Sequence, residues 1–180
     1  MTHSETKPVE TAVETSPDHM HQVMDWRAAF AAGLVAGIVT LLTLLIAYPL
    51  ATGGSPWIVL RYIAAIVLGK AILPPPVTFD ALAVVTGTII HLALSVVYTI
   101  VLALIIHRWG IIVGVIGGAL YGLALFLINM FTFTNIFDWF YPLQSWSFLL
   151  FHLFFGALAG GLYELWERDR YVESVAEEWT

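Results

Sequence analysis

The sequence contains no cysteine and few charged residues. The absence of cysteine excludes disulfides, thiolate metal sites and cysteine nucleophiles. Only 11% of the 180 residues are charged, whereas soluble domains usually carry about 25%. The net charge of −6 lies mostly in the two tails and forms no basic stripe, so nothing favours a nucleic-acid partner.

Motifs that carry enzyme chemistry are also missing. The glycines are not followed by the lysine and hydroxyl residue of a phosphate-binding loop, and no HExxH zinc helix occurs. No signature combines a nucleophile with a base. The sequence therefore predicts a protein that is not an enzyme.

Apolar residues, in contrast, make up 59% of the chain and form long runs. Four runs reach the roughly 20 residues that a helix needs to cross a hydrocarbon core. A spanning segment must satisfy its own backbone hydrogen bonds, so each run is predicted to be a helix. The predicted fold is all-α, a polytopic membrane protein with a four-helix transmembrane bundle. Its predicted spans are 28–50, 82–106, 111–131 and 147–166.

A fifth apolar run, 57–73, contains Arg61 and Lys70 and stops at three prolines. With four spans and cytoplasmic termini, only these two basic residues lie outside. With five spans, Arg108 and the basic residues near the C-terminus would move outside. The positive-inside rule favours four spans, so 57–73 is predicted to be one interfacial or re-entrant helix. A fifth span is the alternative.

The predicted domain organisation places a helical domain between two tails. Residues 1–26 are polar and acidic, with too little apolar surface to fold alone, and are predicted to be a disordered tail. The transmembrane helical domain covers 27–170, and a C-terminal tail covers 171–180. The predicted location is the bacterial inner membrane, with multiple spans and both termini cytoplasmic.

Glycines recur at four-residue spacing in three of the four predicted spans. Residues four apart share one helix face, and small residues there let two membrane helices approach closely. Each ridge is predicted to pack against a sister helix or a neighbouring subunit. The glycines predicted to pack are Gly33, Gly37, Gly114, Gly118, Gly122, Gly156 and Gly160.

Three polar residues share these packed faces: His91, Asn129 and His152. Both histidines lie toward the outer side of their helix midpoints, by roughly 5 Å at 1.5 Å per residue. The sequence thus predicts one buried polar cluster in the outer half of the bundle, with Thr88 and Ser95 nearby. Unpaired polar groups in hydrocarbon cost several kcal/mol, so these side chains are expected at helix contacts.

The cluster has three interpretations. The first is interhelical hydrogen bonding, worth about 0.6 kcal/mol for each bond. The second is a proton-linked or substrate-binding role, since ionisable residues inside membranes are functional candidates. The third is haem b, because His91 and His152 at one level could serve as axial ligands. No metal and no other cofactor is predicted.

The segment 132–146 is rich in aromatic residues and has no lysine or arginine. Aromatic residues are typical of the headgroup level of a membrane. The segment is therefore interpreted as an interfacial belt, with a docking surface for another subunit as the alternative.

Three stretches resemble small bacterial inner-membrane proteins of about four spans, the YagU-like proteins. They are "IIHLALSVVY" (89–98), "GVIGGALYGLALFLINMF" (114–131) and "FHLFFGALAGGLYELWER" (151–168), about half of the chain. The resemblance implies the same multi-span architecture. Some such proteins are labelled solute symporters, but this chain lacks the length and repeated broken helices of that class.

The leading functional prediction is a non-enzymatic integral membrane protein that serves as a structural or accessory subunit of a larger membrane complex. Its predicted partners are the lipid bilayer and other membrane subunits or further copies of itself. The second hypothesis is a small oligomeric transporter or proton-linked channel that uses His91 and His152. The third is a b-type haem protein with bis-histidine ligation.

Overall fold

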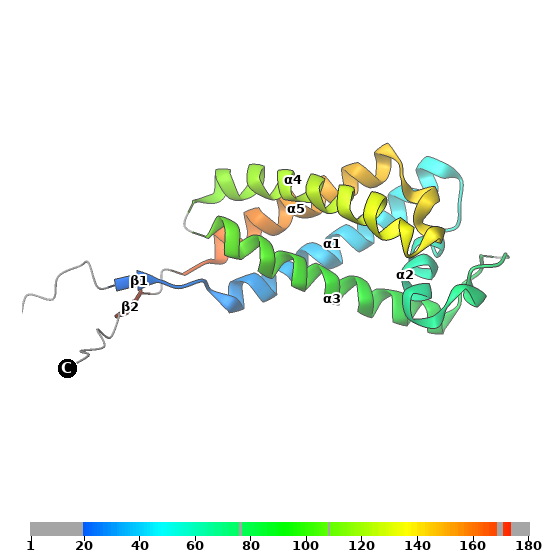
Figure 1. The fold of residues 1–180 in the computed structure, drawn as a ribbon, viewed down its shortest axis with the longest axis horizontal. Coiled ribbons are helices and arrows are strands. Elements are labelled where there is room, and N and C mark those ends of the chain that lie inside the picture. Colours follow the sequence, from blue (N-terminus) through cyan, green and yellow to red (C-terminus); the bar gives the residue numbers. More distant parts are fainter. Residues whose placement is uncertain (1–19, 76, 108, 169–170, 174–180) are drawn as a thin grey trace, which may run out of the picture. The chain divides into compact units, whose positions relative to one another are not determined.

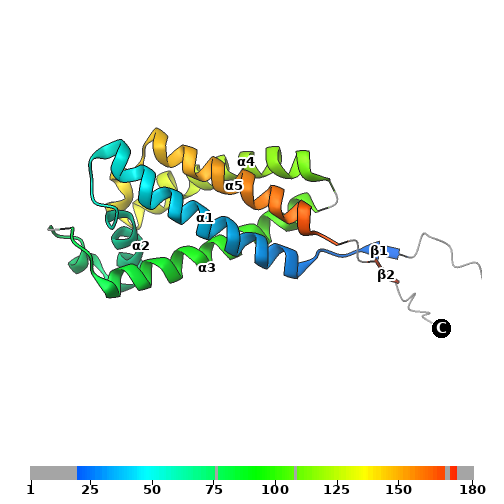
Figure 2. The same cartoon turned by 180° about the vertical axis from the view of Figure 1, so that it is seen from behind.

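The computed structural model describes residues 20–75, 77–107, 109–168 and 171–173. They belong to two compact units, a helical bundle over Met24–Arg168 and a smaller unit formed by residues nearer the two ends of the chain. Figures 1 and 2 show the bundle from opposite sides.

Within the described residues, four helices are long and apolar enough to cross a membrane. A shorter helix of 11 residues, α2, spans about 16 Å, which is too little for a hydrocarbon core of about 30 Å. The predicted all-α membrane bundle with one additional short helix is confirmed. The helical elements are α1 (Trp26–Thr52), α2 (Ile58–Leu68), η2 (Lys70–Ile72), α3 (Ala81–Ile106), α4 (Ile111–Leu127), η3 (Ile128–Thr132), η4 (Phe133–Asn135), η5 (Asp138–Leu143) and α5 (Trp146–Trp166).

Polar side chains and glycines determine where the long helices begin and end. Asp25, Asp80 and Ser145 each accept a hydrogen bond from a backbone N–H in the first turn of the helix that follows. Gly53 ends α1 and Gly110 precedes α4, with φ angles of 68° and 83° that glycine adopts without strain. Three of the predicted spans therefore end within two residues of the observed helices. The predicted span 111–131 differs from the observed helix, because α4 ends at Leu127 and is followed by η3, one turn of π-helix.

Helices α4 and α5 run side by side with their backbones in contact (Figure 1). A β-carbon added at Gly118 would collide with the Gly156 carbonyl oxygen, and one at Gly160 would collide with that of Gly114. Gly122 faces the His152 carbonyl oxygen in the same way. The glycine ridges predicted for the third and fourth spans therefore meet each other within one chain.

Helix α3 packs against α1 over part of its length and against α2 over another part. A β-carbon at Gly33 would stand 2.8 Å from the α3 backbone, and one at Gly37 would stand 2.7 Å from Ser95 Cβ. At the other contact, Gly87 lies directly against the Leu60 carbonyl group of α2. Glycine thus sets the closest approach at both contacts.

The aromatic segment 132–146 is attached to α2 and η2. Trp139 Nε1–H donates a hydrogen bond to the Tyr62 carbonyl oxygen at 3.0 Å. The Lys70 ammonium lies 2.7 Å from the Asp138 carboxylate and 5.4 Å from the centroid of the Trp139 ring. Phe140 and Leu143 are buried while Tyr141 and Trp146 are exposed, so part of the segment packs inward and part has the exposure of a membrane belt.

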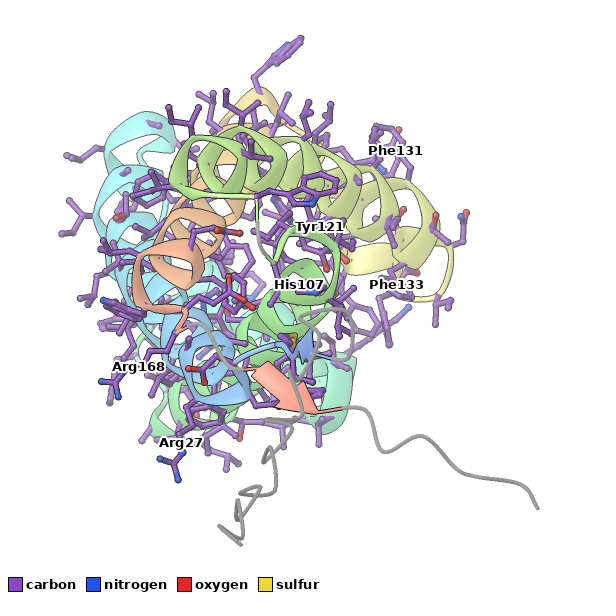
Figure 3. All side chains as sticks on the ribbon, turned by 90° about the vertical axis from the view of Figure 1, so that its left-hand side faces the viewer. Arg27, His107, Tyr121, Phe131, Phe133 and Arg168 are labelled. Atoms are coloured by element: carbon purple, nitrogen blue, oxygen red, sulfur yellow. The ribbon has the colours of Figure 1, made fainter. Side chains whose placement is uncertain are left out.

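The bundle begins and ends at one end, where α1 starts and α5 finishes, and α2 lies at the opposite end (Figures 1 and 2). Figure 3 looks onto the first of these ends and shows Arg27 and Arg168 pointing outward. Four long helices, an even number, produce this arrangement.

The second unit contains an antiparallel pair of short strands. β1 (Met20–Gln22) pairs with β2 (Tyr171–Glu173), with Met20 opposite Glu173. The predicted disordered tail over 1–26 is therefore wrong for Met20–Gln22, because two extended segments satisfy each other's backbone groups without an apolar core. Asp25 and Trp26 also belong to α1 and its cap. The rest of the predicted tails, 1–19 and 174–180, lies outside the described residues.

Candidate functional site

Asn129, in the π-helical turn η3, joins polar side chains of α3 and α5. The Tyr98 hydroxyl donates to Asn129 Oδ1 at 3.1 Å. Asn129 Nδ2 lies 3.3 Å from His152 Nε2, and His152 Nδ1 lies 2.8 Å from the Phe148 carbonyl oxygen. The structure thus brings Asn129 and His152 into direct contact, as their shared faces predicted.

His91 of α3 makes its hydrogen bond to α1. Its Nε2 lies 3.0 Å from the Gly37 carbonyl oxygen. Ser95, one turn later, donates to the His91 carbonyl oxygen at 2.8 Å. His91 therefore bridges α3 and α1, while His152 and Asn129 bridge α5 and η3.

The partners of the two imidazoles assign their tautomers. A carbonyl oxygen only accepts hydrogen bonds, so the proton of His91 is on Nε2 and that of His152 is on Nδ1. In the neutral ring of His152, Nε2 then accepts from the Asn129 amide. In His91, Nδ1 is the acceptor, and it has no hydrogen bond to the described residues.

A cavity of 530 Å³ lies among these side chains, at the end of the bundle that carries α2. Its walls come from all five α-helices and from η3, η4 and η5. Most lining side chains are aliphatic or aromatic, and the described lining residues include no Asp, Glu, Lys or Arg. Small-molecule sites commonly have this size and this apolar character with a few convergent polar groups. The polar lining residues are Thr40, His91, Ser95, Tyr98, Asn129 and His152.

The aromatic segment 132–146 closes part of the cavity. Phe137, Phe140 and Leu143 line it from this segment. Leu94 of α3 and Phe133 of η4 also line it, yet they remain 39% and 40% exposed. Both side chains therefore combine a place in the cavity lining with a large accessible surface, and Figure 3 shows Phe133 at the margin of the bundle.

Four of the five residues of the predicted polar cluster line the cavity, and one does not. His91, Asn129, His152 and Ser95 line the cavity. Thr88 does not line it, although it lies on α3 only three residues before His91 and is half-buried. A three-residue step leaves Thr88 about 60° round the helix from His91 and about 4.5 Å nearer the start of α3, beyond the residues that line the cavity.

Two polar residues of the cavity were missed by the sequence interpretation, Tyr98 and Thr40. Tyr98 lies seven residues after His91, which is two turns along the same face of α3. Thr40 lies three residues after Gly37, whose carbonyl oxygen binds His91. The spacing that identified the other members would have found both, but Tyr98 resembles an interfacial aromatic and Thr40 an ordinary small helix residue.

Bis-histidine ligation of haem would require His152 to give up a hydrogen bond that it makes here. An axial imidazole presents an unprotonated nitrogen to the iron. His152 uses both nitrogens in hydrogen bonds, and His91 uses Nε2 in one. In the described part of the chain, no group of three or more His, Asp or Glu residues is placed to hold a metal ion.

No protein-family model, curated protein or solved structure matches the chain. The resemblance to YagU-like proteins therefore stays a prediction.

Proposed function

We propose that this protein is a non-enzymatic integral membrane protein that binds a mostly apolar small molecule inside the bilayer. The observation that carries the proposal is the 530 Å³ cavity with its few ordered polar groups. Protein interiors pack densely and hold few voids larger than a water molecule. A bundle with a purely structural role does not need a space of this size.

The lining of the cavity indicates the chemistry of its occupant. Phenyl rings from Phe148, Phe151 and Phe155 face it, together with aliphatic side chains of α2 and α3. An apolar molecule placed there gains dispersion contacts with the whole lining. An ion would find no opposite charge among the described lining residues, and burying an unpaired ion is expensive.

The bilayer itself offers a route into the cavity. Leu94 and Phe133 line the cavity and are more than a third exposed, on a bundle with many exposed apolar side chains. Movement of one of these side chains would connect the cavity to lipid. A molecule dissolved in the membrane therefore reaches the site without crossing water.

The hydroxyl groups of the cavity are not arranged for nucleophilic catalysis. A hydroxyl nucleophile needs a base within hydrogen-bond reach. Tyr98 donates to an amide oxygen and Ser95 to a carbonyl oxygen. The Thr40 hydroxyl has no hydrogen-bond partner among the described residues. These contacts support a binding function over an enzymatic one.

The test is photo-crosslinking in lipid nanodiscs with hexadecane that carries a diazirine, followed by mapping of labelled peptides by mass spectrometry. We expect label on cavity-lining residues of α3, η3 and α5. Leu94→Trp should fill the entrance and reduce this labelling several-fold. Leu104→Trp is the control, because Leu104 is an exposed residue of α3 that does not line the cavity. Label confined to lipid-facing residues, unchanged by Leu94→Trp, would refute binding in the cavity.

The basic residues support the predicted orientation. We propose the bacterial inner membrane, with both termini cytoplasmic, because Arg27 and Arg168 are exposed at the end where the bundle begins and finishes. At the opposite end, Arg61 is buried and Lys70 is paired with Asp138.

The other functional predictions stay predictions. An accessory subunit that carries a bound lipid-phase molecule would satisfy both the sequence interpretation and the cavity. For a proton-linked channel, His91 and His152 would have to exchange the hydrogen bonds that now hold both rings.

A further inference from the structure

We infer that the cavity recognises a neutral molecule with a hydroxyl head and a long apolar body, a long-chain alcohol, and that Thr40 and His91 bind the hydroxyl. This inference rests on the proposed binding function and names the class of ligand. It follows from two wall groups whose hydrogen-bonding capacity is unused.

The first group is His91 Nδ1. Because His91 Nε2–H donates to the Gly37 carbonyl oxygen, the neutral ring presents Nδ1 as an acceptor. The side chain lines the cavity, and Nδ1 has no hydrogen bond to the described residues. A ligand that binds here must donate a hydrogen bond.

The second group is the Thr40 hydroxyl. It is buried and has no partner in the part of the chain that the structure describes, whereas Thr43, Ser95 and Thr99 each donate to the carbonyl oxygen four residues earlier. A buried hydroxyl without a partner indicates a missing one. Rotation about its Cα–Cβ bond would turn this hydroxyl, on a residue that already lines the cavity, toward a bound molecule.

Both groups line the cavity, Thr40 from α1 and His91 from α3. Gly37, which binds His91, precedes Thr40 by three residues, so both face α3 from neighbouring turns of α1. An oxygen between them would donate its proton to His91 Nδ1 and accept the proton of Thr40. A hydroxyl does both, whereas a quinone, ester or ether oxygen only accepts.

Charge and shape complete the description of the ligand. The described lining residues carry no formal charge, which disfavours carboxylates, phosphates and amines. The remaining lining is aliphatic and aromatic and suits an alkyl or isoprenoid body. The hydroxyl would bind between Thr40 and His91, and the apolar body would fill the rest of the cavity. This arrangement fixes the orientation of the ligand.

The experiment uses the full-length protein in nanodiscs, with the diazirine-bearing hexadecane as reporter and three competitors. These are cetyl alcohol, its methyl ether and hexadecane. We expect cetyl alcohol to compete about five- to tenfold better than the other two, the effect of one or two hydrogen bonds. Thr40→Val keeps the shape of the side chain and should remove this preference. Thr43→Val is the matched control, because Thr43 bonds its own helix and does not line the cavity.

Each outcome separates the two proposals. Equal competition by the three compounds would leave cavity binding intact and overturn hydroxyl recognition. Preference for the alcohol that survives Thr40→Val would overturn the role of Thr40. Absence of reporter label in the cavity, in all variants, would refute the proposed function itself. Preference for the methyl ether would assign the site to an acceptor-only ligand and overturn the role of His91.

Discussion

At the scale of single residues, Asn129 is the central hydrogen-bonding group of the site. Its amide accepts from Tyr98 of α3 and donates to His152 of α5. An amide both donates and accepts, so it can join a phenol and an imidazole that face each other across a helix contact. An aspartate at this position would instead place a charge in an uncharged cavity.

We predict that Tyr98→Phe lowers the free energy of unfolding by about 0.5–1 kcal/mol, because it removes one interhelical hydrogen bond. Asn129→Ala should cost more, about 1–2 kcal/mol, since it leaves both partners unpaired. Reversible unfolding in mixed detergent micelles measures both. Tyr48→Phe is the control, because the Tyr48 hydroxyl makes no hydrogen bond to the described residues. Equal stability of Tyr98→Phe and Tyr48→Phe would contradict the bond.

At the scale of elements, the contact between α4 and α5 consists of backbone against backbone. Gly114, Gly118 and Gly122 face Gly160, Gly156 and the carbonyl group of His152. The ridge therefore sets the position of the His152 ring as well as the helix spacing. A side chain on the ridge would separate the helices and move His152 away from Asn129.

We predict that Gly118→Ala destabilises the protein by about 1–3 kcal/mol, the usual cost of overpacking. Gly117→Ala should be neutral or slightly stabilising, because its β-carbon would stand 3.6 Å from Ile106 and alanine favours helix. Thermal unfolding of the two variants in the same detergent makes the comparison. A loss of stability in both, by similar amounts, would contradict a specific role for the α4–α5 backbone contact at Gly118.

At the scale of the whole molecule, four crossings place the ends of the bundle together and the short helix α2 opposite them. Helix α2 and the segment 132–146 then cover the end of the bundle at which the cavity lies. A fifth crossing would have separated these two elements.

The absence of cysteine allows a direct test with single-cysteine variants. We predict that Ala51→Cys and Thr78→Cys, which flank α2, react with a membrane-impermeant maleimide from the same side. Arg168→Cys should react only from the other side. All three positions are exposed. Reaction of Ala51→Cys and Thr78→Cys from opposite sides would show that α2 crosses the membrane.

Much of this architecture could be predicted from the sequence, because each span carries its own signal. Long apolar runs, Asp80 and Ser145 before two helices, and the glycine spacing are local features. The π-helical turn at Asn129 could not be predicted in this way, since it depends on what the turn packs against. The strand pairing of Met20–Gln22 was missed for a related reason, because its partner lies at the other end of the chain.

The site was predicted in part. The shared faces of Asn129 and His152 identified their contact, but helix faces do not reveal a space between helices. The cavity depends on where α2 and the segment 132–146 come to lie, and neither has a periodicity that specifies its position. Thr40 acquires its significance only from the cavity that it borders.

The direct backbone contact of α4 with α5 has one mechanical consequence. No layer of side chains separates these helices, so there are no rotamers whose rearrangement would let one slide past the other. Helices α4 and α5 therefore form the rigid side of the site. We therefore expect ligand entry to depend on the elements on the other side of the cavity, where Leu94 of α3 and Phe133 of η4 lie.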